Sequence, residues 1–293
     1  MINEKRLIRS LDSCRWFINN ALNIENNTIT GFELIVPLTE AAAYNTYIET
    51  VSNKADTLYL RSKDSLSEMM VNSYLSYIKR IAPNASFSKR PVTLTFDYTD
   101  EDFYGDVQGF DIHGWTGKDA VKGKFKFITC SIVSNDIPEK IPLISLPIRI
   151  GHYKSDVIIS CLSKIKDIVG DIDLILFDRG FYDKELMYEL TKMNYPYLIF
   201  VPKHLDKKSI LYPMEAGDEI AIYNEYKVNK NYSKYEGKNI LVFLKQIYHK
   251  RSGNSYDWVF ATNVEQIILE NLVVIYKKSG ELRLVLEYRT KPK

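Results

Sequence analysis

The sequence contains little cysteine and little histidine, and neither residue type is spaced to hold a metal. The three cysteines are odd in number and far apart, at Cys14, Cys130 and Cys161. Such a set does not form a disulfide framework, and a reducing cytosol is the expected compartment. The four histidines are dispersed, without the spacing of zinc ligands. Any metal site is therefore expected to use other side chains.

Long apolar runs and a charge imbalance are absent as well. Lys and Arg number 39 against 37 Asp and Glu, a formal net charge of +2. The overall charge therefore indicates no partner, and attraction to a polyanion must come from local patches. No apolar run approaches the length needed to cross a membrane, and the N-terminus leads into no long apolar segment. We expect neither secretion nor membrane insertion, and hence a cytoplasmic protein.

The sequence is instead rich in aromatic residues, with 21 Tyr and 13 Phe, which favour β structure.

The first part of the sequence has a helical pattern. Residues 8–24 and 64–81 repeat apolar side chains every three or four positions, which predicts amphipathic helices. The character of the sequence changes at Pro83-Asn84 and Lys89-Arg90-Pro91. We therefore predict a helical region over 1–90, a candidate for DNA binding although it has no clear helix-turn-helix signature, and a second domain over 91–293.

The second domain is organised around an apolar run at 174–177. This run has no polar residue, which predicts a strand covered on both faces in the middle of a sheet. It ends at Asp178, followed by Arg179, and Asp183 is suited to cap the next helix. A carboxylate thus follows a buried strand, at the sheet edge where ligands collect in α/β folds. The alternative is that Asp178 only caps the helix or pairs with Arg179.

A second strand, 92–97, also terminates in an aspartate, Asp97, and a turn-like acidic stretch follows it at 98–105. The other predicted elements, in chain order, are strands 125–133 and 141–150, a helix 155–169 capped by Ser155, a helix after Asp183, and a strand 195–201. The order β, β, β, α, β, α, β predicts an α/β fold of the ribonuclease-H-like type. This fold is a mixed sheet flanked by helices, in which the first and fourth strands lie side by side.

Residues 203–263 are rich in Lys, Tyr and Asn, with strand-like pieces at 219–228, 239–248 and 256–261. We predict a β-rich insertion here.

Two aspartates at neighbouring strand ends, joined by a third acid, would form an all-oxygen site for a hard divalent cation such as Mg²⁺. Two such ions can activate the attacking oxygen and neutralise the leaving oxygen in phosphoryl transfer.

Three motifs carry a resemblance to a known family: Thr-Phe-Asp-Tyr-Thr-Asp at 95–100, Leu-Phe-Asp-Arg-Gly-Phe-Tyr at 176–182 and Tyr-Leu-Ile-Phe-Val-Pro-Lys at 197–203. From residue 92 onward the sequence resembles the DDE transposases of bacterial and archaeal insertion sequences. The resemblance is to the Tyr-Arg-Glu-Lys signature group, which has a β-rich insertion before its last acidic helix.

The resemblance implies metal-dependent cleavage and strand transfer of insertion-sequence ends, with Mg²⁺ or Mn²⁺ as cofactor. Asp97 and Asp178 would be the first two catalytic metal ligands, and Arg179 would lie near the scissile phosphate. Double-stranded DNA, both the terminal repeats and the target, would be the partner. A homodimer in the DNA complex is one option. The protein would be prokaryotic, and associated with the nucleoid when bound to DNA.

The sequence departs from the family pattern near its end. Ser279 stands where the signature has Arg, and Arg283 stands where it has the catalytic Glu. The nearest acids are Glu281 and Glu287, and Glu287 is the better third ligand because it shares a helical face with Arg283. The sequence also stops before the family's later helices. The alternatives are therefore a truncated, catalytically defective copy that only binds DNA, or a nuclease of this fold that cuts without joining.

Several lysines interleave with aromatic residues and are candidate DNA contacts, because clustered cations bind phosphates. With Arg179, the predicted DNA-binding residues are Lys118, Lys124, Lys203, Lys227, Lys230 and Lys234. The alternative is that they lie on solvated hairpins without a nucleic-acid role.

Overall fold

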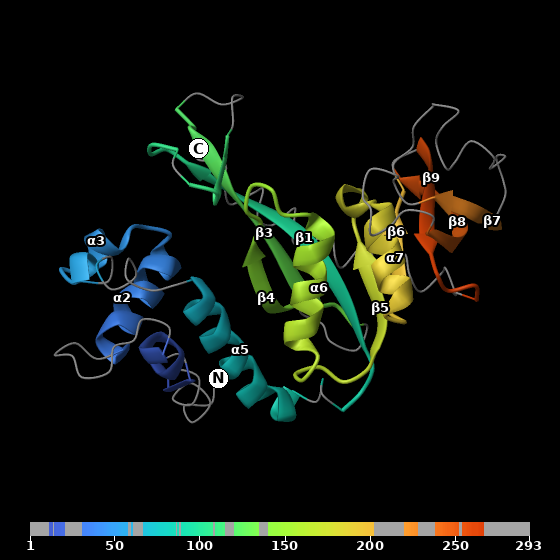
Figure 1. Cartoon of the computed structure of the whole chain (residues 1–293). Helices are drawn as coiled ribbons and strands as arrows, with labels where there is room; N and C mark the ends of the chain where they lie inside the picture. The colour runs from blue at the N-terminus through green and yellow to red at the C-terminus, as the bar shows by residue number, and fades with distance from the viewer. Residues whose placement is uncertain are drawn as a thin grey trace. The chain divides into compact units, whose positions relative to one another are not determined.

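The computed structural model describes residues 12–13, 15–20, 31–57, 60, 67–85, 87, 89–107, 109–114, 120–134, 140–201, 220–227, 238–251 and 254–266. The chain divides into two compact units, Met1–Ala85 and Ser86–Lys293. Figure 1 shows both units and labels most of their helices and strands. None of the described helices is both long enough and apolar enough to span a bilayer.

The first unit is helical. It contains α2 (Gly31–Tyr44), α3 (Ile48–Val51) and α5 (Ser67–Ala85), and residues 15–20 are also helical. The predicted helix at 64–81 is present as α5. Helix α2 was not predicted. It carries Pro37 in its interior, where proline removes a backbone hydrogen bond. Packing compensates for this, because Ala41 of α2 lies in a buried cluster with Ile48 and Ala55.

The second unit contains a mixed sheet. Its strands are β1 (Val92–Phe103), β2 (Ile112–Gly114), β3 (Gly123–Ile132), β4 (Ile141–Pro147), β5 (Ile172–Phe177), β6 (Tyr197–Phe200), β7 (Ile220–Lys227), β8 (Asn239–Arg251) and β9 (Asn254–Thr262). Its helices are α6 (Lys154–Ile165) and α7 (Lys184–Lys192), and η1 (Arg179–Phe181) is a 3₁₀ turn.

The order and directions of the strands confirm the predicted fold class. β4, β3, β1, β5 and β6 lie side by side in that order. β3 is antiparallel to β1 and to β4, whereas β5 is parallel to β1 and to β6. This is the ribonuclease-H-like arrangement, and β5 occupies the middle of the sheet as the apolar run at 174–177 predicted. Leu174 to Phe177 are all buried.

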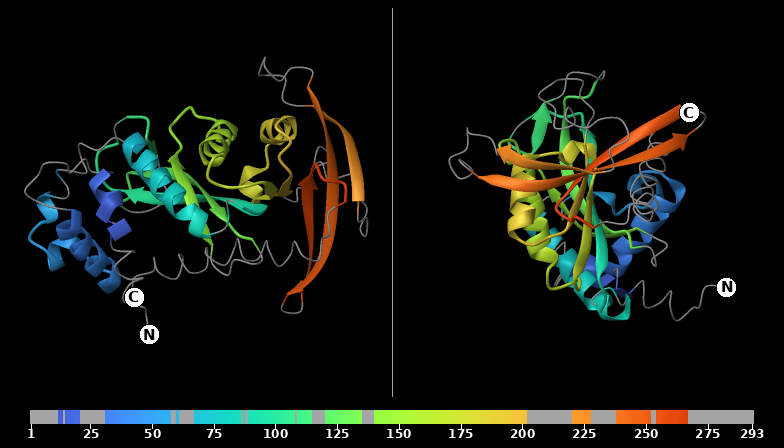
Figure 2. Two further views of the ribbon diagram at one scale, coloured as in Figure 1. Left: turned by 90° about the horizontal axis from the view of Figure 1, so that it is seen from below. Right: turned by 90° about the vertical axis from the view of Figure 1, so that its right-hand side faces the viewer.

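Helices α6 and α7 lie next to each other on one face of this sheet, as both views in Figure 2 show. α6 turns an apolar stripe inward, comprising Val157, Ile158, Cys161, Leu162 and Ile165. The prediction that Ser155 caps this helix is wrong. The helix begins one residue earlier, after Tyr153, whose carbonyl accepts a hydrogen bond from the backbone N–H of Val157. Ser155 therefore lies inside the first turn, where it is buried.

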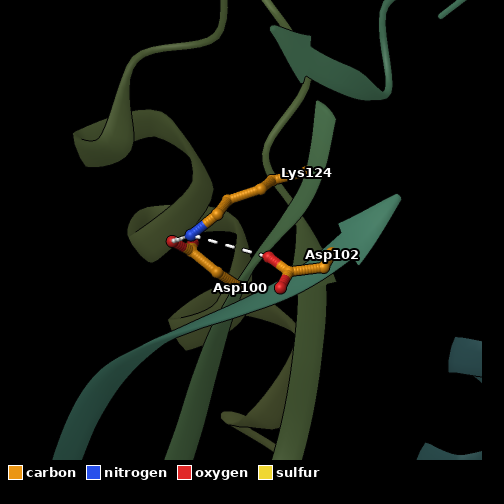
Figure 3. Close-up of polar contacts among 3 residues, drawn as sticks. All are labelled: Asp100, Asp102 and Lys124. Atoms are coloured by element: carbon orange, nitrogen blue, oxygen red, sulfur yellow. Dashed lines mark hydrogen bonds and ion pairs between the residues drawn. The ribbon is translucent and has the colours of Figure 1, made fainter. Parts of the chain in front are cut away.

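The acidic stretch 98–105 is largely strand, which corrects the prediction of a turn. β1 continues to Phe103, and in its antiparallel pairing with β3 Asp100 lies opposite Lys126 and Asp102 opposite Lys124. The Lys124 ammonium lies 3.3 Å from Asp100 and 3.8 Å from Asp102 (Figure 3). Opposite charges across a strand pair stabilise it. Here they outweigh the low strand propensity of aspartate.

The strands predicted in the insertion are present. β7, β8 and β9 form an antiparallel meander close to the expected ranges. β9 also pairs antiparallel with β6, with Ile199 opposite Ala261. The insertion thus continues the main sheet, and its strands share the core of the second unit.

Candidate active site

Asp97 and Asp178 follow neighbouring positions of two parallel strands. Phe96 of β1 is paired with Phe177 of β5, and each aspartate is the next residue along its strand. Parallel neighbours lie about 4.8 Å apart. The Phe96 and Phe177 rings are buried and stack with centroids 5.2 Å apart, which fixes the register. The fold thus brings the two predicted acids to the same level of the sheet, where the pairing of β1 with β5 ends.

The two strands continue differently beyond this point. β1 runs on through Asp97 and stays paired with β3, where Asp97 lies opposite Thr129. β5 stops at Phe177, and the chain turns into η1. The two aspartates therefore lie at the point where β5 ends while the neighbouring strand β1 continues. The apolar runs predicted a strand before each aspartate, but they did not predict that β1 continues beyond Asp97.

Both carboxylate oxygens of Asp97 have partners. Oδ1 accepts a hydrogen bond from the backbone N–H of Tyr98 at 2.9 Å, and Oδ2 lies 3.8 Å from the Lys140 ammonium. The Lys140 side chain is 10% exposed. Burial lowers the pKa of Lys140, and the nearby Asp97 carboxylate acts in the opposite direction. Lys140 was not predicted as a site residue, because no local pattern in the sequence connects the residue before β4 with Asp97.

Asp178 caps the turn that follows it. Its Oδ1 accepts a hydrogen bond from the backbone N–H of Arg179, the first residue of η1. Asp183 caps α7, where its carboxylate accepts from the backbone N–H of Glu185 at 2.9 Å, as predicted. The alternative that Asp178 caps the next helix is confirmed only for the short 3₁₀ turn η1, because α7 is capped by Asp183. A carboxylate has two oxygens with several lone pairs, so a cap on Oδ1 is compatible with a metal ligand.

The turn carrying Asp178 and Arg179 is held by an aromatic cluster. Phe181 is 1% exposed, and its ring stacks on Tyr98 with centroids 4.2 Å apart and an angle of 9°. Lys154 of α6 places its ammonium 4.9 Å from the Tyr98 ring centroid and donates a hydrogen bond to the Gly180 carbonyl. The ring of Tyr98, the residue after Asp97, thus packs on the turn that follows Asp178.

The Tyr98 hydroxyl is buried and has no hydrogen-bond partner among the described residues. Burial raises the pKa of Tyr98, and the neighbouring Asp183 and Asp100 carboxylates raise it further. Tyr98 therefore stays neutral at physiological pH, and its role at this site is that of a packing ring.

Arg179 is exposed, and in the described part of the chain no carboxylate forms an ion pair with it. The salt bridge considered as an alternative for Arg179 is thus not observed there. Arg179 directly follows Asp178 in the sequence, and the planar guanidinium group suits bidentate phosphate binding. Phosphate binding by Arg179 stays a prediction.

Of the remaining predicted residues, most lie outside the described ones. These are Glu287 and the alternative Glu281, together with Lys118, Lys203, Lys230 and Lys234. Lys227 is the last residue of β7, and only its backbone is described. Lys124 is described, and its ammonium is paired with Asp100 and Asp102 (Figure 3). Contact of these lysines with DNA stays a prediction.

A complete metal-ligand set is not found within the described ranges. No cluster of three or more His, Cys, Asp or Glu side chains that could hold an ion occurs there. The carboxylates of Asp97 and Asp178 are the oxygen donors that Mg²⁺ takes, with waters and substrate phosphate filling the other positions. The donor chemistry of the pair fits a hard divalent ion, and the predicted third acid, Glu287, belongs to the part of the chain that is not described.

Cysteine chemistry is not supported at this site. Cys130 and Cys161 are free and buried. Burial raises the pKa of both thiols, that of Cys161 to about 12. Because the thiolate is the reactive form, these two side chains are inert packing residues.

Comparison with known proteins finds distant structural similarity but no match by sequence. No protein-family model matches the sequence, and no curated protein does. Among solved structures, the chain is similar to the piggyBac transposase in a synaptic complex with hairpin DNA. The identity is 10% and the TM-score 0.45, over 98% of this chain and 59% of that chain. The chain thus has a longer transposase as a distant structural neighbour.

Proposed function

We propose that this chain is a metal-dependent DNA transposase that cleaves insertion-sequence ends and joins them to a target. Asp97 and Asp178 are the two catalytic carboxylates on the sheet, and Glu287 supplies the third. One observation carries the proposal, the parallel register that pairs Phe96 with Phe177 and so sets two aspartates at the same level of adjacent strands. The sequence motifs around both aspartates point to the same chemistry.

Mg²⁺ or Mn²⁺ is the proposed cofactor, held by Asp97, Asp178 and Glu287. When bound, it would activate the attacking oxygen and neutralise the leaving oxygen. The aromatic stack of Tyr98 on Phe181 holds the Asp178 turn against β1. Arg179, exposed on that turn, would bind a DNA phosphate, with Lys203, Lys227, Lys230, Lys234 and Lys118 adding contacts along the duplex. The proposed setting is a prokaryotic cytoplasm, with two copies acting on one pair of ends.

A second candidate function is DNA binding without catalysis, as in a defective copy. Two observations favour it. Lys140 pairs with Asp97, so a cation of the protein already neutralises that acid. Ser279 and Arg283 also stand where the resembled family has its Arg and Glu. In that case the fold and the basic residues persist while the acid triad is incomplete.

The test uses labelled duplexes from the DNA that flanks the coding sequence, incubated with the full chain and Mg²⁺. The wild type is expected to cleave and join these ends. D97N and D178N should lower the rate by about 10³-fold or more while binding the duplex normally, because catalytic groups that act as a unit fail together. E287Q should match them, whereas E281Q should not.

D106N is a matched control, since Asp106 is an exposed acid of the same unit. Its rate should equal that of the wild type. Retention of cleavage by D97N or D178N would refute the catalytic assignment. Binding without any cleavage by the wild type, in Mg²⁺ or Mn²⁺, would favour the defective copy.

A further inference from the structure

Lys140 contacts Asp97, one of the two acids, although nothing in its sequence context marks it as a site residue. It immediately precedes β4, and β3 separates β4 from β1. Its ammonium nevertheless lies 3.8 Å from Asp97 Oδ2. Within the described residues Asp97 is its only ion-pair partner at 4.0 Å or less. The side chain therefore spans to β1 for this one contact.

The contact is sheltered. Lys140 is 10% exposed at its side chain and Asp97 is 26% exposed, so both charges lie partly out of water. A lysine this well covered is uncommon unless its charge is compensated. The other oxygen of Asp97 accepts the backbone N–H of Tyr98, so neither oxygen of this carboxylate is without a partner.

We propose that Lys140 is the resident counter-ion of the acid pair, and that a divalent cation must displace its ammonium from Asp97 Oδ2 before it binds. This inference rests on the proposed function, since it assumes that Asp97 is a metal ligand. Two carboxylates on adjacent strands repel each other when no cation is near. The ammonium reduces that repulsion without metal, and for the same reason it competes with metal.

The flexible stem of lysine suits this role. An ammonium on a four-carbon stem can leave one oxygen and be hydrated elsewhere. The competition makes the site weaker for metal than the same two carboxylates would be alone. Lys140 thereby sets the concentration of divalent cation at which the site fills.

The test is a titration of the full chain with Mn²⁺ alone, without DNA, in which electron paramagnetic resonance measures the free ion. K140M should bind Mn²⁺ about fivefold more tightly than the wild type. In this variant the metal no longer has to break the Lys140–Asp97 ion pair, and an ion pair of this exposure is worth about 1 kcal/mol. Methionine keeps the length of the apolar stem and suits the sheltered position. K140R retains the cation and should bind as weakly as the wild type.

D97N provides the coupling test. It should weaken Mn²⁺ binding, and in the D97N background K140M should give no gain, since the two residues act through one contact. A role of Lys140 in folding alone would not produce this pattern. Thermal unfolding of each variant checks that it is folded, and K140Q replaces K140M if the latter does not fold.

The possible results distinguish the counter-ion role of Lys140 from the existence of the metal site. If D97N weakens Mn²⁺ binding while K140M binds no more tightly than the wild type, the counter-ion role is refuted and the metal site stands. If neither the wild type nor K140M binds Mn²⁺, the metal site of the proposed function is refuted together with the inference.

Discussion

Replacing Phe181 by alanine is expected to destabilise the second unit strongly, because the Phe181 side chain packs the turn that follows Asp178 against the sheet. Its ring is 1% exposed and stacks on Tyr98 at 4.2 Å, and it also contacts the Phe177 ring at 5.6 Å. The substitution removes both ring contacts and leaves a cavity between β1, β5 and η1. Buried Phe→Ala substitutions cost about 3–5 kcal/mol.

For Phe181 we expect about 4 kcal/mol, near the middle of that range. Its burial is almost complete, whereas the neighbouring turn is short and can partly collapse into the space. In a unit of about 200 residues, 1 kcal/mol corresponds to roughly 2–4 °C in melting temperature. The expected fall for F181A is therefore about 8–16 °C.

The assay is urea unfolding of the full chain followed by circular dichroism, with thermal unfolding as a second measurement. F110A is the matched control, because Phe110 is the same residue type in the same unit and is 72% exposed. Its free energy of unfolding should change by no more than about 0.5 kcal/mol. A loss for F181A as small as that for F110A would refute the packing described for the turn.

Two further predictions concern the insertion and Tyr98. If the insertion contacts DNA, neutralising Lys227, Lys230 and Lys234 should weaken DNA binding equally across sequences. The slope of log K against log salt, measured by fluorescence anisotropy, should fall in magnitude by about 0.9 for each lost phosphate contact. An unchanged slope would show that these lysines are solvated. Because burial raises the Tyr98 pKa, the unfolded chain releases this proton near pH 10 while the folded chain keeps it, so stability falls as pH rises above about 10. Y98F should reduce that fall by up to about 1.4 kcal/mol per pH unit in urea titrations between pH 9 and 11, and an identical pH dependence in the variant would contradict the burial of the hydroxyl.

The sequence alone determined the elements whose signals are local. The uninterrupted apolar run before Asp178 indicated a buried central strand, and β5 is that strand. Asp183 was predicted to cap α7, because a carboxylate before an amphipathic run satisfies free backbone N–H groups, and it does so. The order of the strands and helices then limited the topology, since parallel strands need a crossover helix. Hence the adjacency of Asp97 and Asp178 along the sheet was predictable.

Only the tertiary structure decided the features that depend on distant partners. β1 continues through an acidic stretch because Lys124 and Lys126 lie opposite it on β3, and α2 keeps Pro37 in its interior while Ala41 packs on Ile48 and Ala55. The same holds for the site. Lys140 is 43 positions from Asp97, and Lys154 is 26 from Gly180, so no short-range pattern relates them. Periodicity and capping act over a few residues, whereas the environment of a carboxylate depends on every strand and helix that the fold brings around it.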